Sequence, residues 1–337
     1  MRATVKDVAA RAGVSPKTVS NVINGVVPVS PDTRTRVEEA LVALAYVPNL
    51  SARGLRNGRT GAIALAFPDL TTPYSAEMSH WFVEVAHERG WSVQLEQTGM
   101  RPERERELLI RGKEHLVDGL VLNPVSLDES AIVGAESLPP VVVIGEVEQS
   151  LVDQVRVDSV AAAHDMTEHL IGLGHRRIAV LGTSGEGLDT ATARARTLGW
   201  AQAMAAAGLP TGDDLRWACA AWSPGAAADA VRRRLEYGDA PDALFCFTDS
   251  LAIGAGHSLW EAGLRVPDDV SLAGFDDVAD GRYALPPLTT VGLDKRRYAE
   301  RALELLAARI ADRDRPPELV VIPHEVVPRA STGRASR

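Results

Sequence analysis

From residue 60 onward, short apolar runs alternate with longer stretches whose apolar residues recur at helical spacing. Residues 61–67 form the first apolar run, and residues 74–89 have the spacing of a helix that ends at Gly90. Further strands are expected at residues 92–96, 119–122, 141–144, 177–181, 243–247 and 270–275. Further helices are expected at residues 102–116, 159–173, 194–207, 224–236 and 250–262. This alternation predicts parallel sheets that are covered by helices on both faces.

The alternation restarts near residue 158, which predicts an α/β core, residues 60–337, of two doubly wound parallel-sheet subdomains with a cleft between them. The boundaries we expect are residues 60–145 with 292–317 for the first subdomain, 158–288 with 318–330 for the second, and 146–157 and 289–294 for the connections. The last helix, at 297–311, is expected in the first subdomain, and the last strand, at 319–323, in the second.

The first 47 residues follow a different pattern, in which short helices are separated by turn residues. Thr4 can begin an imperfect capping box, and apolar residues follow it at helical spacing until Gly13. Ser15 supplies a second N-cap, Pro16 occupies the first helical position, and Gly25 stands where a left-handed residue ends a helix. Two short helices joined by a turn that contains glycine predict a small all-α helix-turn-helix domain.

A third helix is expected to begin after Ser30 and Pro31, with the same order of cap and proline. The apolar residues that can close a three-helix core are Val8, Val19, Val22 or Ile23, Val37, Leu41 and Leu44. The second helix then leaves outward-facing side chains, namely Pro16, Lys17, Thr18, Ser20 and Asn21. The N-terminal end of such a helix fits a DNA major groove, although the same pattern also occurs on a solvated helix of any small bundle.

Charge separates this N-terminal segment from the rest of the chain. Residues 1–59 contain nine Lys or Arg and four Asp or Glu, a net charge of +5. The whole chain has a formal net charge of −9, which leaves −14 for residues 60–337. A basic head on an acidic body is typical of a phosphate-binding module joined to a body that does not bind nucleic acid.

The N-terminal motifs resemble the head of the LacI/GalR family of bacterial transcription regulators. The matching stretches are VKDVAARAGVSPKTVSNVING at residues 5–25, VS at 29–30, TR at 33–34, YVPN at 46–49 and ARGLR at 52–56. The resemblance implies base contacts for Pro16, Lys17 and Asn21. It implies phosphate contacts or helix caps for Ser15, Thr18, Ser20 and Asn24. Phosphate contacts position such a domain on DNA, and base contacts select the sequence.

Residues 48–59 are expected to form a hinge between this head and the core. A helix as short as residues 49–57, with a glycine in its middle, is only marginally stable in water. The resemblance implies a hinge helix that folds on DNA, pairs with its dimer mate in the minor groove and inserts Leu55 between base steps. We therefore add Ala52, Leu55 and Arg56 to the DNA-binding residues, and we expect 49–57 to be disordered without operator.

Polar side chains follow the ends of several expected strands in the core. Ligands of open α/β sheets bind beyond the carboxyl ends of the strands, so these side chains are candidate effector contacts. The candidates are Asp69, Tyr74, Asn123, Thr192, Arg196, Thr248, Asp249 and Asp276, together with Trp222 in the loop before the helix at 224. An aromatic wall among carboxylate, amide and guanidinium groups suits a sugar, because sugar faces stack on rings and hydroxyls take directed hydrogen bonds.

The core also resembles the periplasmic-binding-protein-like core of the same family. Arg196 stands in an Arg-x-x-Gly-aromatic motif, and Asp276 follows Gly274 and Phe275 in a second motif. The resemblance implies that Trp222 and Asn123 occupy effector-contacting positions of sugar-responsive members.

Two departures from the family pattern leave the effector open. Thr248 replaces the asparagine that is common before Asp249, and Leu293 occupies a position that is polar in some sugar binders. A purine-responsive member is expected to have an arginine near Thr190, and this sequence has none there. The alternatives to a sugar are a nucleoside or another small metabolite.

Other classes of function find little support in the residues. The sequence shows no nucleophile–base pair, no metal-ligand cluster and no phosphate-binding loop, so we expect no enzyme, no cofactor and no metal site. Cys219 and Cys246 provide no disulfide framework, and Cys246 is expected to be a buried, reduced thiol. No basic-then-apolar leader opens the chain, which favours a cytoplasmic location.

These features predict a transcription regulator, a repressor by the resemblance, whose affinity for operator DNA is controlled by an effector in the cleft. A homodimer is expected to present two heads to a pseudo-palindromic site, because two-fold symmetry in the protein requires it in the DNA. The competing class is a solute-binding receptor without a DNA role, which a basic head does not favour.

Overall fold

The computed structural model describes residues 3–24, 27–46, 59–124, 130–133, 137–185, 189–238 and 240–335. The chain divides into two compact units, Met1–Thr60 and Gly61–Arg337, and each has its own hydrophobic core. Within the described ranges, the structure has no helix whose length and apolar character would let it cross a membrane.

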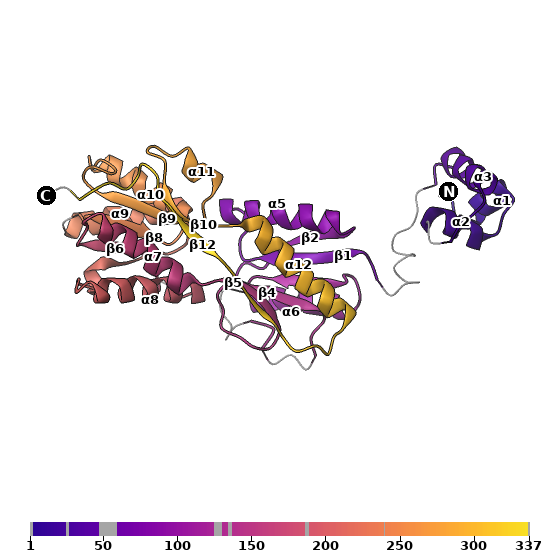
Figure 1. The fold of residues 1–337 in the computed structure, drawn as a ribbon, viewed down its shortest axis with the longest axis horizontal. Helices are drawn as coiled ribbons and strands as arrows, with labels where there is room; N and C mark the ends of the chain where they lie inside the picture. Colours follow the sequence, from indigo (N-terminus) through magenta and orange to yellow (C-terminus); the bar gives the residue numbers. More distant parts are fainter. Residues whose placement is uncertain are drawn as a thin grey trace. The chain divides into compact units, whose positions relative to one another are not determined.

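The first unit is a bundle of three helices, α1 (Val5–Ala12), α2 (Pro16–Asn24) and α3 (Pro31–Ala43) (Figure 1). Val8 and Val37 are both fully buried where α1 packs on α3. The spacing of apolar residues had predicted this core, and the structure confirms it.

Local signals in the sequence set the ends of α1. The predicted capping box is present, because Thr4 Oγ1 accepts a hydrogen bond from the Asp7 N–H and Asp7 Oδ2 accepts one from the Thr4 N–H at 2.8 Å. Gly13 ends the helix with a φ of +65°, a backbone conformation that glycine adopts without strain.

The first sheet of the second unit has the strand order β11-β5-β4-β3-β1-β2, and all of its strand pairs are parallel. Its strands are β1 (Ala62–Phe67), β2 (Ser92–Gln97), β3 (Gly119–Leu122), β4 (Val141–Ile144), β5 (Asp153–Val157) and β11 (Leu319–Ile322). Its helices are α5 (Pro73–Glu88), α6 (Pro102–Lys113) and α12 (Lys295–Ala311). Helices α5 and α12 lie side by side on one face, and α6 covers the other (Figure 1). The central strands are therefore buried on both faces, which is why they read as continuous apolar runs.

The second sheet has the order β12-β10-β9-β8-β6-β7, with only the β10–β12 pair antiparallel. Its strands are β6 (Ile178–Thr183), β7 (Arg216–Ala218), β8 (Ala243–Cys246), β9 (Ser271–Phe275), β10 (Thr289–Leu293) and β12 (His324–Val327). Its helices are α7 (Ser159–Gly172), α8 (Ala191–Ala206), α9 (Pro224–Tyr237), α10 (Asp249–Glu261) and the short α11 (Ala279–Arg282), with a 3-10 turn, η1, at Asp213–Leu215. The pair α7 and α8 covers one side of the sheet, and the pair α9 and α10 covers the other (Figure 1).

The predicted strands and helices of the core are all present, with ends that differ by no more than three residues. The assignment of the last predicted strand is wrong, however. We had placed residues 319–323 in the second subdomain, whereas β11 pairs in parallel with β5 in the first sheet, and β12 then enters the second sheet. Strands β5 and β10 were also taken for connections, and each is a full member of a sheet.

A buried carboxylate explains why the chain before β11 stays on the first sheet. Asp153, at the start of β5, is fully buried and accepts hydrogen bonds from Arg309 Nε, Arg315 Nη1 and the Glu318 N–H, each at 2.9 Å. A buried charge is stable only when it is paired and hydrogen-bonded, so this site holds α12 and the start of β11 against β5.

Candidate functional site

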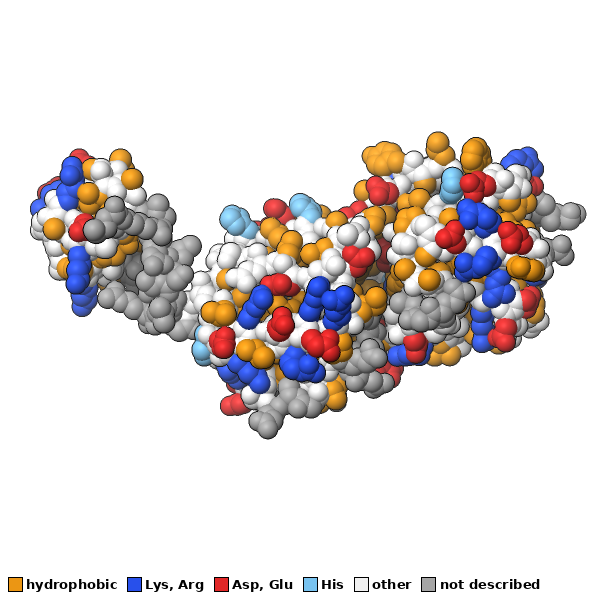
Figure 2. Space-filling view, turned by 180° about the vertical axis from the view of Figure 1, so that it is seen from behind, with side chains coloured by type: hydrophobic (Ala, Val, Ile, Leu, Met, Phe, Trp, Pro, Cys, Tyr) orange, Lys and Arg blue, Asp and Glu red, His pale blue; other side chains and the backbone are white. Residues whose placement is uncertain are grey.

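The predicted DNA-reading helix turns its polar side chains to solvent. Val19 and Val22 of α2 are 0% and 7% exposed and anchor the helix to the core of the first unit. The exposed or partly exposed side chains of this helix include Pro16, Lys17, Thr18, Ser20 and Asn21. Figure 2 shows further Lys and Arg side chains on the surface of this unit. Hydroxyl, amide and cationic groups of this kind make the phosphate and base contacts of DNA-binding domains.

Ser15 acts as the cap of this helix, one of the two roles expected for it. Its Oγ accepts a hydrogen bond from the Thr18 N–H at 3.1 Å and lies 2.9 Å from Thr18 Oγ1. The other predicted DNA contacts, namely the Asn24 side chain, Ala52, Leu55 and Arg56, lie outside the described residues, as does the expected hinge helix at 49–57.

Side chains carried by both sheets gather around a buried arginine in the second unit. This group, the Arg196 cluster, consists of Tyr74, Glu146, Ser159, Thr192, Arg196, Trp222, Phe275 and Asp276. Tyr74 is at the start of α5, and Glu146 follows β4, so these two belong to the first sheet. The remaining members belong to the helices, strands and loops of the second sheet, which makes the cluster a junction between the subdomains.

Arg196 is 5% exposed and is held by contacts on several sides. Its guanidinium carbon lies over the Phe275 ring, 3.4 Å from the ring centroid, and its Nη1 donates to the backbone oxygen of Phe247. The glycine of its motif has a packing role, since a Cβ on Gly199 would lie 2.1 Å from the Val160 carbonyl oxygen of α7. Gly199 therefore lets α8 approach α7 closely enough to place Arg196.

Glu146 connects the two subdomains, and the sequence analysis did not identify it. Its Oε1 accepts a hydrogen bond from Ser159 Oγ at 2.9 Å, and its Oε2 accepts one from Thr192 Oγ1 at 2.8 Å. Arg196 Nη2 lies 3.8 Å from Oε1. The strand-end rule that selected Asn123 would also have found Glu146, which stands two positions after β4, but we had read residues 146–157 only as a connection.

Two acidic groups of the cluster have raised pKa values. Burial raises the pKa of the Asp276 carboxyl well above its usual value, while Arg196 acts in the opposite direction. Burial also raises the pKa of the Tyr74 hydroxyl, and the nearby Asp276 and Glu146 carboxylates raise it further. The Tyr74 hydroxyl therefore keeps its proton at physiological pH.

Trp222 supplies an unused hydrogen-bond donor beside these groups. Its ring is partly buried, with its centroid 6.0 Å from the guanidinium carbon of Arg196. Its Nε1 is buried and has no hydrogen-bond partner within the described part of the chain. A buried N–H without an acceptor lowers stability, and within the described residues the fold leaves this donor unused.

Two of the predicted effector contacts, Asp249 and Thr248, form hydrogen bonds within the fold. Asp249 is fully buried; its Oδ1 accepts from Thr290 Oγ1 at 2.6 Å and its Oδ2 accepts from the Val278 N–H at 2.9 Å. Thr248 is the N-cap of α10, where its hydroxyl accepts from the Leu251 N–H at 3.1 Å. The bonds of Asp249 tie α10 to the segments that follow β9.

The two predicted contacts that follow β1 and β3 differ in their surroundings. Asp69 is exposed, and its Oδ1 accepts from both the N–H and the hydroxyl of Thr71 at 2.8 Å, a local turn. Asn123 is partly buried, and its Nδ2 donates to the Ile144 carbonyl oxygen at 3.2 Å, directly before Gly145 and Glu146. Asn123 thus lies next to the Arg196 cluster along β4, and Asp69 has no described contact with it.

Helix α7 carries a group of potential metal ligands. His164, Asp165 and Glu168 of α7 bring ligand atoms within 4.8 Å of one another, and their side chains are partly or largely exposed. Such spacing is typical of a solvated helix face, so we assign no ion to it. Cys219 and Cys246 are both buried, and Cys246 is a free thiol, as expected.

Comparisons with known proteins agree with both units. Residues 4–49 match bacterial regulatory proteins of the lacI family, and residues 167–332 match the periplasmic binding protein-like domain. The chain is 33% identical over 333 residues to the HTH-type transcriptional repressor PurR of Aliivibrio salmonicida, covering 98% of each protein. It is 35% identical over 315 residues to PurR of Haemophilus influenzae, covering 93% of this chain and 92% of that protein.

Two solved structures extend the comparison to the whole fold. The Lac repressor dimer bound to operator and the anti-inducer ONPF is 27% identical with a TM-score of 0.85, covering 99% of this chain and 100% of that chain. The transcriptional regulator CelR in complex with cellobiose is 29% identical with a TM-score of 0.72, covering 98% of this chain and 100% of that chain. This chain therefore belongs to the LacI family of bacterial regulatory proteins, and it is a DNA-binding transcriptional repressor, not an enzyme.

Proposed function

We propose that the operator affinity of this repressor is controlled by a polyhydroxylated small molecule, a sugar or sugar derivative, bound at the Arg196 cluster. The observation that carries the proposal is the buried Nε1 of Trp222, which has no hydrogen-bond partner among the described residues and lies beside the Arg196 guanidinium. Both are hydrogen-bond donors, and the Glu146 and Asp276 carboxyls next to them are acceptors. Closely spaced donors and acceptors beside an aromatic face match a sugar, whose hydroxyls both donate and accept.

The domain arrangement we propose follows from the same parts. Residues 1–47 form the DNA-binding domain, 48–59 the hinge, and 60–337 the effector-binding and dimerisation core. A homodimer presents two heads to a pseudo-palindromic operator. The folding of the hinge on DNA, with Leu55 as a wedge between base steps, stays a prediction.

Control of DNA binding would pass through the junction between the subdomains. Glu146 on the first sheet already bonds to Ser159 and Thr192 on the second, so a ligand that contacts these groups changes the free energy of one arrangement of the subdomains relative to another. A coupling of about 1–3 kcal/mol between effector and operator is ordinary for such a switch.

A purine base or nucleoside is the second candidate effector. Its support is the similarity to the PurR repressors, 33–35% identical in sequence. The arginine expected near Thr190 for a purine site is absent, and Thr190 is buried as the N-cap of α8, with its hydroxyl accepting from the Ala193 N–H at 3.0 Å. A sugar complex of a solved relative, CelR with cellobiose, supports the first candidate.

A thermal-shift screen of the purified protein against sugars, sugar derivatives, purine bases and nucleosides separates the candidates, because a tight ligand raises the unfolding temperature by mass action. We expect a sugar to give the shift. A shift by purines alone would overturn the sugar proposal and leave the site assignment standing.

Trp222→Phe tests the site itself, since it keeps an aromatic face and removes only the N–H donor. Loss of one hydrogen bond should weaken effector binding about three- to tenfold. The matched control is Trp260→Phe, because Trp260 lies on α10 with 74% of its surface exposed. Equal effector affinity of Trp222→Phe and Trp260→Phe would remove the Arg196 cluster as the binding site.

A further inference from the structure

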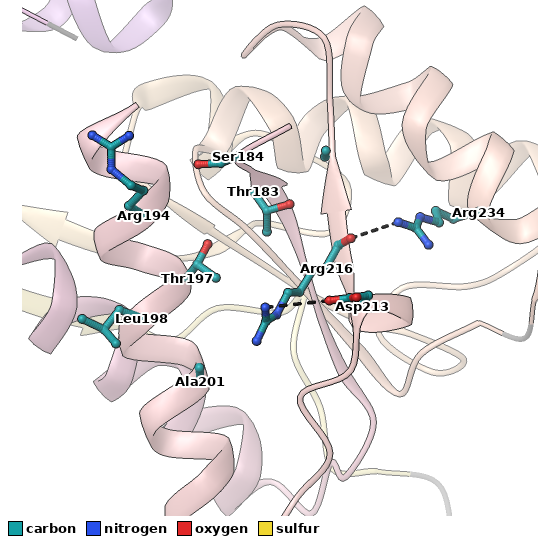
Figure 3. A pocket seen from close by; sticks show the side chains of 10 residues that line it. Thr183, Ser184, Arg194, Thr197, Leu198, Ala201, Asp213, Arg216 and Arg234 are labelled. Atoms are coloured by element: carbon teal, nitrogen blue, oxygen red, sulfur yellow. Dashed lines mark hydrogen bonds and ion pairs between the residues drawn. The ribbon is translucent and has the colours of Figure 1, made fainter. Parts of the chain in front are cut away.

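A cavity lies on another side of α8, away from the Arg196 cluster. Its volume is about 570 Å³, and Figure 3 shows the side chains that line it. The polar ones are Thr183, Ser184, Arg194, Thr197, Arg216 and Arg234, together with Asp213. An α-helix turns about 100° per residue, so Arg194 points about 160° away from Arg196 around the axis of α8. The cavity and the Arg196 cluster therefore use different faces of one helix.

The cavity is positively charged in a unit whose overall charge is negative. Its lining contains three arginines, contributed by α8, β7 and α9, and one acid, Asp213. The Asp213 side chain is fully exposed and 3.8 Å from Arg216 Nη1, so water screens the pair and Asp213 offsets little of the charge. Residues 60–337 carry a net charge of −14. Three arginines around one cavity therefore form a local positive charge in a negatively charged unit.

The arginines are incompletely neutralised by the described residues. Arg194 pairs with Asp189 at 2.7 Å, but the two side chains are 52% and 62% exposed. The bond described for Arg234 goes from Nη2 to the backbone carbonyl oxygen of Arg216, at 3.0 Å, which does not compensate its charge. Arg216 Nε is buried and has no hydrogen-bond partner within the described part of the chain.

The Arg216 side chain as a whole is 39% exposed and lines the cavity, so its guanidinium can bind an anion there. Guanidinium groups bind phosphate and carboxylate oxygens through paired, charge-assisted hydrogen bonds. Thr197 donates its hydroxyl proton to the Ala193 carbonyl oxygen at 2.7 Å, which leaves the lone pairs of its oxygen to accept from a ligand hydroxyl. Leu198 and Ala201 add an apolar wall on α8, so the lining suits a small organic body that carries the anionic group.

We propose that this cavity is a second ligand site, for a phosphorylated small metabolite whose phosphate is bound by Arg194 and Arg216. The proposal does not depend on the identity of the effector at the Arg196 cluster. A ligand in the cavity contacts α8, the helix that also presents Thr192 and Arg196 to the subdomain junction.

Isothermal titration of the full chain with inorganic phosphate, sulfate and glycerol 3-phosphate, at an ionic strength of about 0.15 M, tests the proposal. We expect saturable binding of glycerol 3-phosphate, weaker binding of inorganic phosphate, and a dissociation constant raised about tenfold or more in Arg194→Glu and in Arg216→Gln. Arg216 also packs against the Trp200 ring at 5.7 Å, so the exposed Arg194 provides the variant that leaves the fold intact.

The matched control is Arg232→Glu, the same change of charge on α9. Arg232 pairs with Asp229 and Glu261, and it is not part of the cavity lining. Binding in this variant should stay within about twofold of the wild type. Absence of saturable binding would overturn the proposal, and so would equal weakening by Arg194→Glu and Arg232→Glu. Loss of binding in Trp222→Phe would also overturn it, because that result places the anion in the Arg196 cluster.

Discussion

Asp249 provides a direct test of whether a strand-end carboxylate contacts a ligand or supports the fold. Sequence reasoning placed it among the effector contacts. In the structure it is completely buried, and its oxygens accept hydrogen bonds from the Thr290 hydroxyl and the Val278 N–H. The substitution Asp249→Asn keeps the size of the side chain and removes its titration. If the carboxyl acts only inside the fold, this change alters the pH dependence of stability and spares effector binding.

The expected size follows from the pKa of Asp249. Burial raises it from 3.8 to about 7, against the hydrogen bonds from Thr290 and Val278, which lower it. An acid with a higher pKa in the folded state takes up a proton on folding, so its contribution to stability is fully present below pH of about 4 and is lost as the pH rises through about 7. Each pH unit in this window corresponds to about 1.4 kcal/mol, so this group adds about 2–3 kcal/mol to the unfolding free energy between pH 8 and pH 5.

Urea unfolding of the wild type and Asp249→Asn at pH 5, 6, 7 and 8 measures this difference directly, because other titrating groups are common to both proteins. We expect the wild type to gain about 2–3 kcal/mol over the variant from pH 8 to pH 5. Effector affinity at pH 8 should stay within about twofold, because no ligand contact is removed. Parallel pH profiles would refute the burial argument, and a large loss of effector affinity would return Asp249 to the binding site.

Three further predictions concern the other parts of the molecule. Asn21→Ala should weaken specific operator binding by about 1–3 kcal/mol and leave binding to random DNA nearly unchanged, measured by fluorescence anisotropy with both duplexes. Gly199→Ala should lower the unfolding temperature, because the new Cβ would lie 2.1 Å from a backbone oxygen of α7. The control Gly225→Ala should not lower it, since a Cβ there would have no described heavy atom within 4 Å. Equal melting curves for the two variants would contradict the close approach of α8 to α7. Asp153→Asn should lower the unfolding free energy, measured with urea, by about 3–5 kcal/mol. The control at the exposed Asp229, Asp229→Asn, should lower it by less than about 1 kcal/mol. Similar values for the two variants would show that the buried Asp153 does not stabilise the fold as proposed.

The described helices of the head could be predicted from the sequence, whereas the predicted helix end at Gly25 lies outside the described residues. The cap at Thr4, the turn at Gly13 and the N-cap at Ser15 act on neighbouring residues, and the structure has each of them where the sequence placed it. Apolar spacing likewise selected Val8, Val19 and Val37 for the core. In a bundle this small, caps and apolar spacing, which act over a few residues, set both the ends of each helix and the face that it buries.

The candidate site in the core could be predicted only in part. The strand-end rule selected Tyr74, Thr192, Arg196 and Asp276, and the loop before the helix at 224 added Trp222. The structure brings these residues together in the Arg196 cluster. The same rule could not separate residues that contact a ligand from residues that are hydrogen-bonded within the fold. Whether a carboxylate is left to bind a ligand depends on hydrogen-bond partners from segments distant in the sequence.

The sequence by itself determined the local structure of this protein: which residues form helices and apolar strands, and which polar groups stand at strand ends. The tertiary structure alone decided which sheet β11 joins, that Glu146 bridges the subdomains, and that Asp249 is an internal acceptor. The physical reason is the range of the interactions involved. Caps and apolar periodicity act over a few residues, whereas the bond between Asp153 and Arg309 that holds α12 against β5 joins positions 156 residues apart, and only the folded chain brings such partners together.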